Sequence, residues 1–220
     1  LTVAELTPEV CGVTSVAIPG VKASTNVEID VVDGNLNISK DVESQTGSVG
    51  LRASGDQGGD ANDIVIGDGS NGQVKAAGTV SLEAAGKVED NNGAAKAAVV
   101  TPGTLVVRGD SLVGNTGPFE TEVATLAAQT TGDMKVKDLT GNLTVGSGTT
   151  ILGNTATTGA TSSDGNICIQ AADGTLTITQ AVSANDAGPQ TTGVGKVGLS
   201  GKDGIVLNAA ISADEKISLY

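Results

Sequence analysis

Four aspartates crowd a glycine-rich segment near residue 60, and they form the densest acidic cluster in the chain. They are Asp56, Asp60, Asp63 and Asp68. Carboxylate oxygens are hard ligands that suit Ca²⁺, and glycines permit the tight turns that bring such ligands together. The chemistry that these residue types and their spacing favour is therefore the binding of a divalent cation in a loop.

The segment from Gly58 to Ile66 is similar to the calcium-binding nonapeptide of repeat-in-toxin proteins, in which glycines form the turn and aspartate supplies the ligands. Ala61 stands where that pattern has its second glycine, and Gly72 stands where the following repeat would have its aspartate. The alternative interpretation is an acidic, solvated corner loop, and no other cofactor is expected. The resemblance implies three metal ligands, Asp60, Asp63 and Asp68.

Side chains suited to catalysis are scarce. The chain has no histidine, and its only arginines are Arg52 and Arg108. Nucleophilic systems that depend on histidine are therefore excluded, and a glycosidase would have to work with paired carboxylates alone. Aromatic platforms for sugars are also lacking, because Phe119 and Tyr220 are the only aromatic residues. We expect a protein that is not an enzyme, with a carbohydrate-binding or carbohydrate-cleaving β-helix as the alternative.

A short motif, in which a glycine precedes hydrophobic residues at alternating positions, recurs along most of the chain and must position these side chains. Each copy is typical of a turn followed by a short strand with one buried face. Such strands bury that face only by stacking on one another, so the repeat predicts an all-β, parallel β-solenoid with about three short strands per coil and irregular corner loops. The copies begin at Gly34, Gly47, Gly78, Gly103, Gly132, Gly141, Gly165, Gly174 and Gly195.

The motif also suggests how the chain is divided. Residues 1–30 lack it and are interpreted as a divergent first coil or a cap, whereas residues 31–220 are interpreted as one elongated β-solenoid within a longer chain or filament. Residues 122–128 favour a strand over a helix because of their neighbours. Polar, glycine-rich segments such as 109–121 and 152–164 are assigned to corners and surface loops.

Charge and cysteine content limit the classes of partner that we expect the chain to bind. The net charge of −13 disfavours nucleic acid and anionic membrane surfaces, and no apolar run is long enough for a membrane-spanning helix. Cys11 and Cys168 lie far apart along the chain, so we expect free thiols and no intrachain disulfide. Cys168 lies between two isoleucines, and strand alternation points it away from their face, which makes it a candidate for contact with another subunit. The leading leucine and the lack of a signal peptide suggest a processed product or an excerpt.

Three stretches resemble the repeats of filamentous haemagglutinin-like exoproteins and of giant bacterial proteins with related β-strand repeats. They are residues 132–145, 173–184 and 203–213. The resemblance covers roughly residues 30–219 and concerns composition and period. It implies a right-handed parallel β-helix, export to the cell surface or the extracellular medium, and a role in adhesion or fibre formation.

Together these observations predict a structural or adhesive segment that forms a rod, stalk or filament. Expected partners are further copies of the chain, in end-to-end or lateral contacts, and a host or cell-surface glycan or protein. Residues 216–220 are strand-like without a polar cap, which favours stacking at that edge. The predicted core residues are Leu36, Ile38, Val49, Leu51, Ile64, Ile66, Val80, Leu82, Leu105, Val107, Met134, Val136, Leu143, Val145, Ile167, Ile169, Leu176, Ile178, Val197, Leu199, Ile217 and Leu219.

Overall fold

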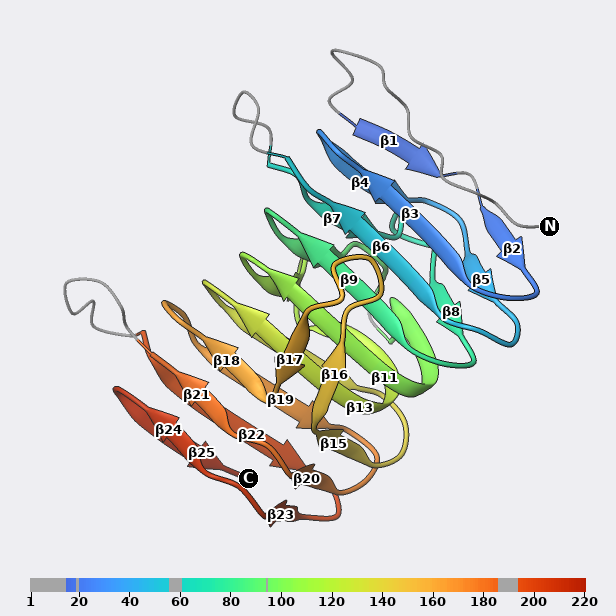
Figure 1. Ribbon diagram of the computed structural model, residues 1–220. Coiled ribbons are helices and arrows are strands. Elements are labelled where there is room, and N and C mark those ends of the chain that lie inside the picture. The colour runs from blue at the N-terminus through green and yellow to red at the C-terminus, as the bar shows by residue number, and fades with distance from the viewer. Residues whose placement is uncertain (1–14, 19, 56–60, 94, 186–193) are drawn as a thin grey trace.

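The computed structural model describes residues 15–18, 20–55, 61–93, 95–185 and 194–220. Every regular element in these ranges is a β-strand, and 23 of the strands form one large sheet that curls around a single apolar interior (Figure 1). All pairings named within this sheet are parallel, which confirms the predicted all-β, parallel, solenoid-like architecture. No helix in the described part of the chain is long and apolar enough to cross a membrane.

The strands stack in three rows. In the first row, strands from successive passes of the chain lie side by side. Each strand pairs in register with the next strand of the row. Its members are β1 (Ser15–Ile18), β4 (Asn35–Ile38), β7 (Ile64–Ile66), β10 (Val88–Asp90), β12 (Leu112–Gly114), β14 (Met134–Asp138), β19 (Ile167–Ala171), β22 (Lys196–Gly201) and β25 (Lys216–Leu219).

The second and third rows begin separately and are joined by two long strands. The second row contains β2 (Val21–Ala23), β5 (Val42–Ser44) and β8 (Val74–Ala76), and the third contains β3 (Val27–Val31), β6 (Val49–Ala53) and β9 (Val80–Ala84). The strands β11 (Val99–Gly109) and β13 (Phe119–Thr130) then run through both rows.

Beyond β13 the third row divides into two branches, and the division lies between Leu126 and Ala128. Leu126 pairs with Val145 and Ala128 pairs with Ala160, so that Ala127, which lies between them, pairs with neither branch. One branch contains β15 (Leu143–Val145), β20 (Leu176–Ile178) and β23 (Ile205–Leu207), and the other contains β18 (Ala160–Ser162), β21 (Val182–Ala184) and β24 (Ile211–Ala213).

A two-stranded antiparallel hairpin leaves the sheet at this split. It consists of β16 (Ser147–Thr149) and β17 (Ala156–Thr158), and it lies across the outside of the third row (Figure 1). Residues 152–164 and 109–121 are expected from their sequence to be corners and surface loops. That assignment is wrong where these segments contain β17, β18, β12 and the start of β13, whereas the strand expected at residues 122–128 is confirmed within β13.

The interior is built from aliphatic layers, as the alternating motif predicts. Among the predicted core residues, all are buried except Ile217 and Leu219, whose side chains are 44% and 47% exposed. Both belong to β25, which pairs with β22 on one side and has no strand beneath it in the structure. Phe119, the largest buried side chain, was not predicted because the apolar pattern around it is broken by a glycine- and proline-containing stretch.

Glycine in the motif is required where backbones of successive strands approach closely. A Cβ added to Gly165 would lie 2.2 Å from the carbonyl carbon of Gly132, and one added to Gly174 would lie 2.2 Å from the carbonyl oxygen of Gly141. Contacts this short are not tolerated, so the corners can stack only where side chains are absent. This explains why the copies of the motif at Gly165 and Gly174 begin with glycine.

Candidate functional site

The corner between the first and second rows carries the most elaborate polar structure of the described residues. Its connections lengthen from residues 39–41 to residues 67–73 and 91–98, and they shorten again to residues 115–118. Longer connections project beyond the sheet and create relief at this corner. Exposed loops held on a rigid scaffold are common places for binding residues.

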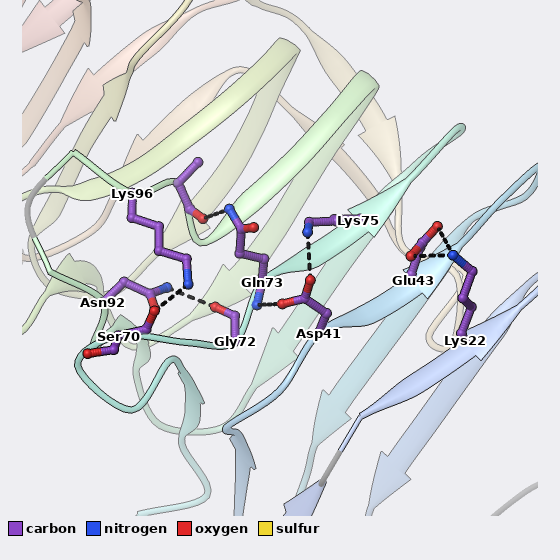
Figure 2. Close-up of polar contacts among 10 residues, drawn as sticks. Lys22, Asp41, Glu43, Ser70, Gly72, Gln73, Lys75, Asn92 and Lys96 are labelled. Atoms are coloured by element: carbon purple, nitrogen blue, oxygen red, sulfur yellow. Dashed lines mark hydrogen bonds and ion pairs between the residues drawn. The ribbon is translucent and has the colours of Figure 1, made fainter.

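The upper part of this corner is held by charged and amide side chains (Figure 2). Lys22 pairs with Glu43 across β2 and β5 at 3.0 Å, and Lys75 pairs with Asp41 at 2.6 Å. The Gln73 Nε2 group donates a hydrogen bond to the carbonyl oxygen of Ala97 at 2.7 Å. Because these groups are partly exposed, we infer that they align the corner and contribute little to its stability.

The loop that contains Asp68 is fixed in place from two sides. The Asp68 Oδ1 atom accepts hydrogen bonds from the backbone N–H groups of Asn71 at 2.8 Å and Ser70 at 3.2 Å, which lowers the pKa of this carboxyl. Lys96 donates to the Ser70 carbonyl at 2.6 Å, and Asn92 donates to the Gly72 carbonyl at 2.9 Å (Figure 2). The Asp68 carboxylate thus organises its own turn.

The predicted calcium ligands are distributed as follows. Asp60 lies outside the described residues. Asp63 and Asp68 lie at opposite ends of β7, and the Asp63 Oδ1 atom accepts a hydrogen bond from the Lys87 backbone N–H at 2.7 Å. A strand of three residues with its flanks spans about 10 Å or more, whereas Ca²⁺ ligands lie about 2.4 Å from the ion. The described residues contain no group of three or more metal-ligating side chains, and the calcium site stays a prediction.

A hollow of about 520 Å³ opens where the corner meets the loop at residues 115–118. Asp90 lies at its back, at the inward position that isoleucine occupies in β4 and β7. Its two oxygens accept hydrogen bonds from the backbone N–H groups of Asn92 at 2.9 Å and Glu120 at 3.1 Å. Burial nevertheless raises the pKa of Asp90, since desolvation disfavours its charged form.

The other charged groups of this hollow are already paired. Glu120 is buried and accepts hydrogen bonds from the Lys137 ammonium group at 3.1 Å and from the Lys96 backbone N–H at 3.1 Å. Gln170 also lines the hollow, and its side chain has no hydrogen-bond partner among the described residues. The arrangement offers hydrogen-bond donors and acceptors to a polar ligand.

A second hollow of about 710 Å³ shares the loop at residues 115–118 and lies beside the first row. Lys135 and Cys168 line it from successive strands. Cys168 is exposed while Ile167 and Ile169 are buried, so the predicted outward direction is confirmed. Partial burial by its neighbours raises the pKa of the Cys168 thiol, and Lys135 opposes this effect. Cys11 lies outside the described residues.

Asp138 is the most deeply buried acid of the described residues. Its Oδ1 atom accepts hydrogen bonds from the Thr121 hydroxyl at 3.0 Å and the Val123 backbone N–H at 2.8 Å, while its buried Oδ2 atom has no partner. Burial raises its pKa to about 7, and nearby Glu122 contributes in the same direction. Asp138 is enclosed between strands and lines neither hollow at this corner.

Sequence reasoning missed Asp90, Glu120 and Asp138, although a signal was present for two of them. Asp90 follows Val88 by two residues and Asp138 follows Val136 by two, so strand alternation places both carboxyls inward. An acid at an inward position marks a buried polar group that needs partners. Glu120 carried no such signal, because its burial depends on the path of the loop before it.

Comparisons with known proteins add no family to this description. No family model, curated protein or solved structure matches the chain.

Proposed function

We propose that this chain is a noncatalytic structural or adhesive segment of a secreted or surface-exposed protein. In this proposal the chain is a right-handed β-helix, each coil has about three short strands, and the coils stack into a rod, stalk or filament. The observation that carries the proposal is the continuous ladder: strand pairs follow one another in register from β1 to β25. Length and repetition are what such an architecture supplies.

The edge at β25 supports stacking. Five of the exposed large hydrophobic residues lie on or directly after the last strands, and they are Val206, Leu207, Ile217, Leu219 and Tyr220. β25 also leaves one side of its backbone unpaired within the structure, and such an edge is a template for another strand. We propose that this edge receives further coils or another copy of the chain, and that lateral contacts with copies or with a host glycan or protein occur along the sides.

The experiment that tests this proposal is electron cryo-microscopy of the purified protein with its power spectrum. Filaments with a layer line at about 4.8 Å would support fibre formation by stacked coils. Discrete short particles at all concentrations would contradict it. Leu219→Lys places a charge on the β25 edge and should prevent end-to-end growth, whereas Ser218→Lys on the same strand is the matched control.

A second candidate function is carbohydrate binding in the hollow of about 520 Å³, and it is favoured by the Gln170 amide, which lines the hollow without a hydrogen-bond partner among the described residues. Sugars present hydroxyls that can donate and accept, so paired charges and a free amide are suitable partners. Glycan-array binding that is lost in Gln170→Ala and kept in Gln180→Ala would support this function. Absence of binding to all neutral glycans would remove it.

A further inference from the structure

The hairpin β16–β17 lies on the outer face of strands that are far from it in sequence. At its base, the Gly159 backbone N–H donates to the Gly146 carbonyl at 2.8 Å. Toward its tip, the Ile151 N–H donates to the Ser81 hydroxyl at 3.0 Å, and the Gly153 N–H donates to the Glu83 carboxylate at 3.0 Å. Both contacts join residues that are 70 positions apart.

The surface under the hairpin consists of uncharged residues at outward positions of the sheet. Gly50, Ser81, Val106 and Ala127 form one outward-facing line, in register from β6 through β9 and β11 to β13. All four are buried, although outward positions of a solenoid normally face water. Glu28 continues the same line on β3 and is exposed, so the line becomes polar where the hairpin ends.

Close packing between hairpin and sheet depends on small residues from both sides. A Cβ added to Gly50 would lie 3.0 Å from the Ile151 Cβ atom, and one added to Gly148 would lie 2.5 Å from the Val106 Cγ2 atom. Arg108, which lies two residues after Val106 on β11, donates a further hydrogen bond of 3.3 Å to the Thr157 hydroxyl. The hairpin thus contacts β13, β11, β9 and β6 in turn, as its position in Figure 1 also shows.

We propose that the hairpin is a strap that makes β6, β9, β11 and β13 one cooperative unit. In a solenoid each layer contacts only its neighbours, so layers can open one after another. The strap adds contacts that bypass the intervening strand pairs. Opening of β6 or β9 therefore requires that the strap detach, and its detachment is opposed by the packing of β11 and β13 beneath it.

A shorter connection elsewhere in the chain can be copied to make a variant without the strap. In the following layer, residues 179–181 connect Ile178 to Val182, which pair with Val145 and Ala160 on either side of the hairpin. Replacing residues 146–159 by Thr-Gln-Ala, the sequence of residues 179–181, therefore removes the strap and keeps a connection that the fold already uses.

Native-state hydrogen exchange tests the proposal, with amides of β6 and β9 as the readout. The strapless variant should lose protection there by about tenfold or more, since the two hydrogen bonds to β9 and a buried patch are lost, while β20 and β21 keep theirs. Unchanged protection in β6 and β9 would overturn the proposal, and so would an equal loss throughout the chain.

A point variant keeps the test decisive if the replacement prevents folding. Gly50→Leu collides with Ile151 and Leu152 at the tip, and it should release the Ile151 and Gly153 amides and lower protection in β9. Gly198→Leu is the matched control on the outer face of β22, where an added Cβ meets nothing within 4 Å. Equal exchange in the two variants would contradict the strap.

Discussion

Asp138 provides the sharpest quantitative prediction, because the fold encloses its carboxyl and leaves one oxygen without a partner. With a pKa of about 7 in the folded chain and an ordinary value of 3.8, the native state retains a proton that the unfolded chain has already released. Stability from this group is therefore complete below the ordinary value and is lost as the pH rises toward 7. The full difference corresponds to about 4 kcal/mol.

The assay is chemical unfolding in urea at a series of pH values from 4 to 8, comparing the wild type with Asp138→Asn. Asparagine keeps an oxygen to accept the Thr121 and Val123 hydrogen bonds, and it cannot ionise. The difference in unfolding free energy between the two proteins should shift in favour of the variant by about 4 kcal/mol across this range. Asp90 is present in both proteins, so its contribution cancels.

Asp110→Asn, at an exposed position, is the control and should follow the wild type at every pH. If wild type and Asp138→Asn show the same pH dependence, the carboxyl is not held neutral by burial. If the wild type gains stability relative to the variant as the pH rises, the sign of the reasoning is wrong.

Three further predictions concern packing and the thiol. Ile169→Asp should destabilise the fold by about 3–5 kcal/mol through an unpaired buried charge, whereas Cys168→Asp on the outward side should cost about 1 kcal/mol or less, as measured by urea midpoints. Gly165→Ala should lower the melting temperature because its Cβ would meet the Gly132 backbone at 2.2 Å, whereas Gly198→Ala should leave it unchanged. In a Cys11→Ser background, Lys135→Ala should slow alkylation of Cys168 at pH 8, because Lys135 favours the thiolate; a faster reaction would contradict this.

Most of the interior could be predicted from sequence because it depends on a local rule. Alternation within each copy of the motif determines which residues point inward, and Leu36, Met134 and Ile178 are buried as expected. Ile217 and Leu219 obey the same alternation, but their burial requires a neighbouring strand, which the motif alone does not supply.

The strap could not be predicted from its own sequence. Residues 146–159 are rich in glycine and threonine, and read locally they are typical of a loop. Their conformation depends on the outward-facing line of residues that β6, β9, β11 and β13 contribute. The signal lay elsewhere, in the uncharged residues Gly50, Ser81, Val106 and Ala127 at outward positions where other strands carry lysine or glutamate.

Because of the strap, the middle section of the molecule can carry tension in two ways, through the hydrogen-bonded ladder and through the hairpin backbone. Parallel ladders place their hydrogen bonds along the direction in which strands stack, so a pull from β1 toward β25 loads one rung after another in series, and the weakest rung determines the breaking force. The hairpin crosses these rungs between β13 and β6, with its covalent backbone running alongside them. Under tension this middle section carries load through the chain itself as well as through the ladder, so extension should begin in the sections without a hairpin.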